Sequence, residues 1–254
     1  MVTTVVDYKS VFISDTHLGF KGAKAKPLNN FLTNHHSDNL YLVGDIIDGW
    51  RLQKKFFWPE QHTQAIKHIL AKSNNGTKVH YLIGNHDEAI TNLMNMGLQF
   101  GKIKFHTQMD HHGVDGKKYL VCHGDMFDSL MNSNLGKAIM LLGSSLYDLM
   151  LDINTFINVI ARKLNMPYVN LTGFAKNKTK AACNYLLKFE NLLSQYANSK
   201  RYDGVICGHI HSPEIKIISD TIYMNCGDWV ENCSALVEHH DGRWEILKWG
   251  RSSD

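Results

Sequence analysis

Five short apolar segments recur along the chain, and each is followed by a cluster of polar residues. The segments are Val11-Phe12-Ile13, Leu40-Tyr41-Leu42-Val43, Val79-His80-Tyr81-Leu82-Ile83, Tyr119-Leu120-Val121-Cys122 and Gly204-Val205-Ile206-Cys207. Runs of this length, bounded by glycine and polar residues, are typical of buried β-strands. Stretches such as Glu60 to Ser73 have apolar residues at helical spacing instead. The alternation of strands and helices over residues 8–126 predicts a layered α/β sheet.

Residues 127–200 differ from the rest of the chain. They show no strand-like alternation, and their apolar residues form two stripes at helical spacing. The stripes are Leu146, Leu149, Met150, Ile153, Ile157 and Ile160, and then Leu186, Leu187, Phe189, Leu192, Leu193 and Tyr196. Strand-like runs return over residues 203–249, where Asp241-Gly242 is a hairpin turn signal. The pattern predicts one domain over residues 1–254, with a helical insertion at 127–200.

Composition narrows the class of protein. A chain of 254 residues with 44% hydrophobic and 20% charged residues can bury a sizeable core. The formal net charge of +3 is too small to indicate a nucleic-acid partner by itself. Five cysteines without Cys-x-x-Cys spacing indicate free thiols in a reducing compartment. With no signal-peptide pattern and no apolar stretch long enough to span a bilayer, we expect a cytoplasmic protein.

The polar clusters after the five strands share one chemistry. In order they are Asp15-Thr16-His17, Gly44-Asp45-Ile46-Ile47-Asp48, Gly84-Asn85-His86-Asp87, His123-Gly124-Asp125 and Gly208-His209-Ile210-His211. If the strands share a sheet and end at one edge, all five clusters meet there. Carboxylates and imidazoles gathered in one place are tolerated mainly around a metal ion. Glycines in these clusters permit tight turns and close backbone approach, at Gly44, Gly84, Gly124 and Gly208.

Two divalent metals would need a bridging ligand and a mixture of nitrogen and oxygen ligands. Asp15 and His17 stand at positions i and i+2, which face the same side of a strand, and would bind one metal. His209 and His211 repeat this spacing and could send one imidazole to each metal. Asp45, directly after a strand, is the natural bridge. The candidate ligands are Asp15, His17, Asp45, Asn85, His123, His209 and His211.

This series of clusters resembles the calcineurin-like metallophosphoesterase superfamily. The blocks of that superfamily are Asp-x-His, Gly-Asp-x-x-Asp, Gly-Asn-His-Asp, a His-Gly-Asp-like block and Gly-His-x-His, and all five occur here in order across residues 15–211. The resemblance implies phosphoester hydrolysis and a four-layer αββα sandwich, an α/β (α+β) fold whose second sheet takes the last strands. The ligands that it implies are Asp15, His17, Asp45 and His211 for one metal, and Asp45, Asn85, His123 and His209 for the other.

The donor set of nitrogen and oxygen atoms, without thiolate, suits Mn²⁺, Fe²⁺ or Zn²⁺ better than Ca²⁺. Analogy to the family favours Mn²⁺. Two such ions can polarise a phosphoryl oxygen and generate hydroxide at neutral pH. The resemblance places His86 near the leaving-group oxygen, as a proton donor or a stabiliser of charge. Asp48 can orient a ligand imidazole or cap a helix, while Asp87 and Asp125 can serve turns or support the site. His80, inside a strand, is expected to pack in the core or on a sheet face.

Two longer segments resemble the bacterial group of UDP-2,3-diacylglucosamine diphosphatase-like proteins, which cleave a lipid A precursor. They are Gly44-Asp45-Ile46-Ile47-Asp48-Gly49-Trp50-Arg51 and Gly227-Asp228-Trp229-Val230-Glu231-Asn232-Cys233. The resemblance implies that the insertion is a lid for acyl chains and that Asn177, Lys178 and Lys180 contact substrate phosphates. The alternatives are helices that only cover a core and lysines that are solvated charges. Authentic members carry arginine where this chain has His86, so the chain resembles a sister group.

The expected function is metal-dependent hydrolysis of a phosphoester or pyrophosphate, with a UDP-diacylglucosamine-like lipid A precursor as the substrate. One alternative is a phosphodiesterase or nucleotidase of other specificity. Another is a non-catalytic binding scaffold, against which the complete set of candidate ligands argues. The expected partner is a small-molecule phosphoester, such as a lipid-linked UDP-sugar. Peripheral association with the inner membrane fits that substrate, and no nucleic acid is expected.

Overall fold

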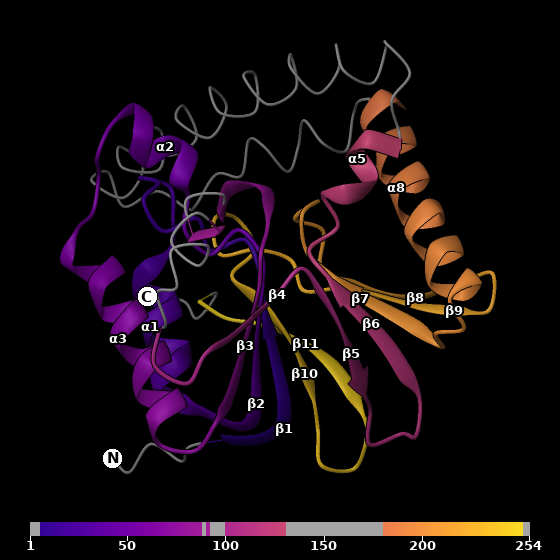
Figure 1. Ribbon diagram of the computed structural model, residues 1–254, viewed down its shortest axis with the longest axis horizontal. Helices are drawn as coiled ribbons and strands as arrows, with labels where there is room; N and C mark the ends of the chain where they lie inside the picture. Colours follow the sequence, from indigo (N-terminus) through magenta and orange to yellow (C-terminus); the bar gives the residue numbers. More distant parts are fainter. Residues whose placement is uncertain (1–5, 88–89, 92–99, 131–179, 251–254) are drawn as a thin grey trace. The chain divides into compact units, whose positions relative to one another are not determined.

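The computed structural model describes residues 6–87, 90–91, 100–130 and 180–250, without the side chains of 129–130 and 180–184 (Figure 1). The chain divides into two compact units. The first comprises Met1–Asp125 and Leu193–Asp254, and the second Met126–Leu192. Both sheets and all five polar clusters belong to the first unit.

The first sheet has six strands in the order β11-β10-β1-β2-β3-β4. Four of them run parallel, namely β1 (Val6–Ile13), β2 (His35–Val43), β3 (Lys78–Leu82) and β4 (Lys104–His106). Their register aligns Ile13 with Leu42 and Val43 with Leu82. Parallel strands in close register end at one edge, so the clusters that follow β1, β2 and β3 lie together.

Helices cover one face of this sheet. They are α1 (Ala25–Asn34) and α3 (Glu60–Asn74), while the short α2 (Gly49–Lys54) and the 3-10 turn η1 (Asn85–Asp87) follow the ends of β2 and β3. Leu28 and Phe31 of α1 and Ile69 of α3 share a buried cluster with Val11 and Val79 of the sheet. Since this face is sealed by apolar contacts, the polar strand ends are left at the sheet edge.

The second sheet has five strands in the order β5-β6-β7-β9-β8. These are β5 (Gln108–His112), β6 (Lys118–Cys122), β7 (Gly204–Cys207), β8 (Glu214–Ile218) and β9 (Thr221–Asn225). Phe12 and Tyr41 of the first sheet pack with Val121, Ile206 and Met224 of the second in one buried cluster. The two sheets therefore lie face to face, which is the centre of the expected αββα sandwich.

Two details differ from the sequence-based expectation. The five strands before the polar clusters do not share a sheet, because β1, β2 and β3 belong to the first and β6 and β7 to the second. The last strands do not all join the second sheet either. β10 (Ser234–Glu238) pairs antiparallel with β1, and β11 (Trp244–Lys248) pairs with β10. A hydrogen bond from Ser10 to buried Glu238 (2.8 Å) ties β10 to β1.

The second unit includes α5 (Met126–Leu130) and most of α8 (Lys180–Ser199). The Tyr185 hydroxyl donates to Asp128 at 2.9 Å within it. The second helical stripe of the sequence is confirmed as α8. Residues 131–179 lie outside the described residues, so the helical insertion at 127–200 stays a prediction. Within the part of the chain that the structure describes, no helix combines the length and apolar character needed to cross a bilayer.

Candidate metal centre

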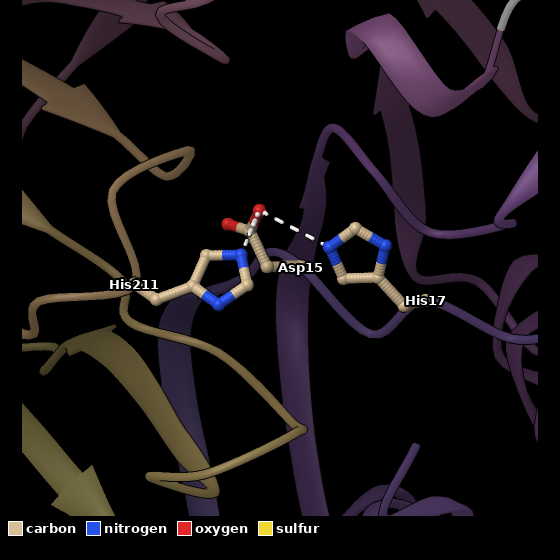
Figure 2. Close-up of side chains that lie close together, drawn as sticks. All are labelled: Asp15, His17 and His211. Atoms are coloured by element: carbon tan, nitrogen blue, oxygen red, sulfur yellow. Dashed lines mark ion pairs between the residues drawn. The ribbon is translucent and has the colours of Figure 1, made fainter. Parts of the chain in front are cut away.

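The polar clusters of the two sheets meet in the first unit. His123, after β6, brings its Nε2 to 3.3 Å from Asp45 Oδ2, after β2. His211, after β7, brings its Nε2 to 3.1 Å from Asp15 Oδ1, after β1. Figure 2 shows Asp15 between His211 and His17, whose Nε2 lies 3.8 Å from the same oxygen. The clusters thus converge from both sheets of the sandwich, rather than from one.

Three overlapping groups of side chains offer ligand atoms that all lie within 4.8 Å of one another. They are Asp15, His17 and His211; His17, Asp45 and His86; and Asp15, Asp45 and His123. Asp15, His17 and Asp45 each belong to two groups, so neighbouring positions share ligands. Overlap of this kind suits two metal ions set close together.

The remaining candidates border the same groups. The Oδ1 of Asn85 is buried, and the backbone N–H of the next residue, His86, donates to Asp45 Oδ1 at 2.9 Å. The ring of His209 packs edge-on against His123, with 5.1 Å between ring centroids, and its backbone N–H donates to Asp15 Oδ2 at 2.9 Å. The seven side chains singled out from sequence are therefore all in this region. His86 was not expected among the potential ligands, yet its Nε2 lies 4.0 Å from Asp45 Oδ2.

Unsatisfied buried atoms test whether these residues fit a metal. Asp15 Oδ1, Asn85 Oδ1 and His123 Nε2 are buried and have no hydrogen-bond partner in the part of the chain that the structure describes. The 3.1 Å and 3.3 Å contacts of Asp15 and His123 are short enough for ion pairs, but they lack hydrogen-bond geometry. A buried polar atom without a partner costs about 1–3 kcal/mol. A cation would satisfy all three atoms, so the donor set fits a metal centre.

The backbone at this site is unusual. Five of the candidate ligands have a positive φ, which residues other than glycine rarely adopt. They are Asp15 (51°), His17 (45°), Asp45 (54°), His209 (69°) and His211 (52°). Such conformations cost on the order of 1–3 kcal/mol each and persist only where the surroundings fix them. Strained backbone conformations cluster at functional sites, so their concentration at these five residues supports a functional role for this region.

The glycines of the clusters act as the sequence suggested. Gly44 has φ of 79°, and a Cβ there would collide with the ring of His123. Gly84 has no room for a Cβ because the Asp45 carboxylate lies against it. At Gly208 a Cβ would stand 2.5 Å from Asp15 Oδ2. Close approach of backbone to ligand therefore requires glycine here.

Asp48 makes the contacts that both of the roles left open for it require. It caps α2 by accepting the Arg51 backbone N–H at 3.0 Å. Its two oxygens also lie 3.2 Å from His17 Nδ1 and 3.0 Å from His86 Nδ1. Burial opposes ionisation of Asp48, but the hydrogen bonds from the two imidazoles outweigh it and hold the pKa of the carboxyl well below its usual value.

These contacts set which imidazole nitrogen can bind a metal. With Nδ1 of His17 on Asp48, the Nε2 is left facing Asp15 and Asp45. His123 Nδ1 lies 2.9 Å from the Val43 carbonyl, which can only accept, so Nδ1 carries a proton and, in the neutral ring, the lone pair is on Nε2. Burial would lower the pKa of His123, but the Asp45 carboxylate outweighs it and raises that pKa well above the usual value.

Asp87 holds the loops that carry the candidate ligands. Its carboxylate accepts the backbone N–H of Asp45 (2.7 Å), Ile47 (2.9 Å) and Gly84 (3.1 Å), together with the Tyr81 hydroxyl (2.7 Å). Burial, with the charge of Asp45 beside it, raises the pKa of Asp87 to about 6. These contacts fit both roles that were open for Asp87, since its carboxylate closes the turn at Gly84 and also holds the loop of Asp45 and Ile47.

Sequence reasoning missed the contacts of three residues, Trp50, Arg51 and Tyr81. The Trp50 ring packs on His86 with centroids 4.2 Å apart, and Trp50 is 43% exposed. The Arg51 guanidinium lies over the Phe20 ring at 3.8 Å and pairs with Asp48 at 3.3 Å. The third residue is Tyr81, whose hydroxyl donates to Asp87 as described above. The signal visible in the sequence was the position of Trp50 and Arg51, two and three residues after Asp48.

Three further residues were predicted to contact substrate phosphates, namely Asn177, Lys178 and Lys180. Asn177 and Lys178 fall outside the described residues. Lys180 begins α8, and its side chain is not described. Their role remains a prediction.

Comparison with known proteins gives three kinds of match. A sequence model of the calcineurin-like phosphoesterase family matches residues 8–213. A curated relative, UDP-2,3-diacylglucosamine hydrolase of Porphyromonas gingivalis, is 27% identical over 128 residues, which is 46% of this chain and 46% of that one. The chain thus aligns with less than half the length of that relative.

Solved structures also match over most of their length. One is of a novel archaeal phosphodiesterase, with 11% identity, a TM-score of 0.44 and coverage of 94% of this chain and 98% of that one. Another is of a phosphoesterase from E. coli, with 12% identity, a TM-score of 0.43 and coverage of 95% and 99%. The family match is more informative, because residues 8–213 include every polar cluster of the site. This protein belongs to the calcineurin-like phosphoesterase family.

Proposed function

We propose that the protein hydrolyses the pyrophosphate bond of a UDP-diacylglucosamine-like lipid A precursor with two divalent metal ions. The observation that carries the metal-dependent part is the set of buried atoms on Asp15, Asn85 and His123 that have no partner among the described residues. The relative from Porphyromonas gingivalis, a UDP-2,3-diacylglucosamine hydrolase, supports the substrate.

Asp45 is the proposed bridging ligand. It lies closest to the middle of the site, since Oδ2 is 3.3 Å from His123, 3.9 Å from His17 and 4.0 Å from His86. The residues proposed for one metal are Asp15, His17, Asp45 and His211; those proposed for the other are Asp45, Asn85, His123 and His209. Mixed nitrogen and oxygen donors suit Mn²⁺, our first choice, and also Fe²⁺ or Zn²⁺. Bound ions of this kind lower the pKa of water and polarise a phosphoryl oxygen.

His86 is the proposed proton donor to the leaving group. Asp48 holds its Nδ1 at 3.0 Å, and the Trp50 ring packs on its face. This leaves Nε2 as the atom that can donate. The side chain of His86 is 22% exposed, more than that of His17 at 9% or of His123 at 0%. A partly open imidazole beside buried candidate ligands suits contact with a substrate.

Peripheral membrane association is part of the proposal. The segment of α2 and the loop after it, Gly49 to Pro59, holds four aromatic and three basic residues and no acidic residue. Phe56 is 78% exposed and stands beside exposed Lys54 and Lys55. Exposed aromatic rings with adjacent lysines suit the interface of an anionic membrane. A surface of this kind close to the site would bring the enzyme to a lipid-linked substrate.

A second candidate function is hydrolysis of another phosphodiester or nucleotide. The observation that favours it is His86 itself, because histidine is the residue of the general superfamily at this position. If this second function holds, adding acyl chains to a UDP-sugar would not improve it as a substrate.

Matched substrates separate the two functions. With Mn²⁺ added, the rates on UDP-2,3-diacylglucosamine, deacylated UDP-glucosamine, an aryl phosphodiester, a dinucleotide and single-stranded DNA are compared. We expect the acylated substrate to have much the highest kcat/KM, because each buried CH₂ contributes about 0.8 kcal/mol. Equal values for the acylated and deacylated substrates would reject the lipid substrate, and no metal-dependent hydrolysis of any of them would reject the metal centre. The Asp45→Asn variant is the control for activity of a contaminant.

A further inference from the structure

The segment that follows β9, Gly227 to Cys233, contacts the candidate metal centre without supplying any of the candidate ligands. It is one of the two segments whose sequence resembles the diphosphatase-like group. The Trp229 backbone N–H donates to the Asp15 carbonyl at 3.0 Å. The Asn232 side-chain amide donates to the His211 carbonyl at 2.9 Å. Asp15 and His211 are both proposed ligands of the same metal, so this segment is bonded to the backbone of two ligands of one ion.

A buried carboxylate folds the segment into a tight turn. Asp228 is 0% exposed, and its Oδ1 accepts the backbone N–H groups of Val230 (2.8 Å) and Glu231. Aspartate commonly stabilises turns by accepting the N–H groups that follow it. The Asp228 Oδ2 also accepts the side-chain amide of Asn232. Because an amide nitrogen has two N–H groups, one can bond to Asp228 and the other to His211, which fixes the orientation of the Asn232 side chain.

The carbonyl that Asn232 holds belongs to a strained residue. His211 has a φ of 52°, in the left-handed region that residues other than glycine rarely adopt. Such a conformation persists only where the surroundings fix it. The Nε2 of His211 lies 3.1 Å from Asp15 Oδ1. A change in the backbone of His211 would therefore move a candidate ligand atom away from the other ligands of its metal.

The beginning of the loop from Gly208 to His211 is held by other groups. The Gly208 N–H donates to the His123 carbonyl at 3.1 Å. The Gly208 carbonyl accepts the side-chain amide of Asn225, which is fully buried, at 2.7 Å. These bonds do not involve Asn232. Loss of the Asn232 amide should thus release the end of the loop that carries His211, while the beginning of the loop stays in place.

We propose that Asn232 is a positioning residue for His211 and that it sets the affinity of one of the two metals. The metal concerned is the one proposed for Asp15, His17, Asp45 and His211. This inference rests on the two-metal centre of the proposed function, but it does not depend on which phosphoester is hydrolysed. Groups that orient a metal ligand typically contribute about 10–100-fold in metal affinity. Removal of the Asn232 amide should reach that range at one metal position only.

Mn²⁺ binding to the full chain tests the inference with two measurements. Calorimetric titration of the metal-free protein gives the two dissociation constants. Anomalous scattering from crystals equilibrated with limiting Mn²⁺ gives the occupancy beside His211 and beside His123. The variant is Asn232→Ala. The matched control is Asn29→Ala, because the Asn29 amide also donates to a backbone carbonyl at 2.9 Å, that of Gln61.

A second variant, Asn232→Ser, covers the case in which the alanine variant does not fold. Its hydroxyl can still donate to Asp228, but its shorter side chain should not also reach His211. The unfolding midpoint of each metal-free chain shows whether it is folded at the temperature of the titration. The same selective loss is expected in Asn232→Ser, and wild-type affinities in that folded variant would contradict the positioning role.

We expect the metal beside His211 to bind about 10–100-fold more weakly in Asn232→Ala, with the metal beside His123 changed little. The Asn29→Ala control should match the wild type at both positions. Unchanged binding in Asn232→Ala, an equal loss at both positions, or a loss confined to the position beside His123 would each overturn the inference while the wild type still binds two metals. A wild-type chain that binds no pair of metals would overturn the proposed metal centre together with it.

Discussion

The Asp48→Asn substitution tests the positioning of the candidate catalytic imidazoles. In the wild type one oxygen of Asp48 faces His17 and the other faces His86, at 3.2 Å and 3.0 Å. Asparagine has nearly the same shape but only one acceptor oxygen. Its amide would have to point its own N–H toward one of the two Nδ1 atoms, so one imidazole loses its partner.

The size of the effect follows from the hydrogen bond that the substitution removes. Hydrogen bonds to a charged group contribute about 1.5–3 kcal/mol each. In the variant one of these bonds is lost, because the amide N–H of the asparagine faces the N–H of an imidazole. Loss of a group that orients a metal ligand typically lowers metal affinity or activity about 10–100-fold. Helix capping should persist, because asparagine caps helices about as well as aspartate does. We therefore expect a 10–100-fold lower kcat with little loss of folding stability.

The assay measures kcat and the Mn²⁺ concentration for half activity with an aryl phosphodiester, and the unfolding midpoint in the same buffer. Asp38→Asn is the control, since exposed Asp38 pairs with Lys9 at 3.0 Å and such surface pairs contribute at most about 1 kcal/mol. Wild-type kcat and metal affinity in Asp48→Asn would refute the reasoning. A collapse of stability without a change in metal affinity per folded molecule would leave Asp48 with a capping role alone.

Three further predictions concern the metal, His86 and His80. Chelation should lower the unfolding midpoint and Mn²⁺ should restore it, since an ion at about 100 times its Kd stabilises by about 2.7 kcal/mol; an unchanged midpoint would contradict metal binding at the unsatisfied buried atoms. His86→Ala should keep its metal content by elemental analysis and lose about 10²–10⁴-fold in kcat, so near wild-type turnover would contradict a catalytic role. The pKa of His80 is about 4 in the folded chain, below its ordinary value, so the unfolded chain binds more protons and stability falls as pH drops from about 6.5 toward 4. His80→Gln should flatten that fall by roughly 1 kcal/mol, after allowance for partial solvent exposure, in urea unfolding at pH 7 and pH 5.

The sequence predicted which side chains gather at the strand ends because the information for it is local. Asp15 and His17, or His209 and His211, stand within a few residues of a strand end, and strand ends are readable from apolar runs. The donor chemistry then follows from residue type. The glycine requirement was readable for the same reason, since a turn that brings Gly84 against Asp45 leaves no room for a Cβ.

Strand partners and the contacts of Asp48 were not readable in this way. The residues of β10, Ser234–Glu238, do not indicate whether the strand pairs with β1 or extends the second sheet. The choice depends on what buries the two faces of the strand in the folded chain. Likewise, the sequence placed Asp48 three residues after Asp45 but did not show that its two oxygens reach imidazoles from two different clusters. Both facts arise from tertiary packing.

The strained backbone of the candidate ligands links the fold to metal binding. Several of the positive-φ residues are held by hydrogen bonds between clusters. Asp15 N–H donates to the Gly44 carbonyl at 3.0 Å, and His17 N–H to the Asp45 carbonyl at 2.9 Å. His209 N–H in turn donates to the Asp15 carboxylate. These clusters hold one another in place, so the ligand geometry exists only after β1, β2 and β7 have come together. An ion that binds this geometry binds the folded chain and not the unfolded one, and metal affinity and folding stability must then rise and fall together.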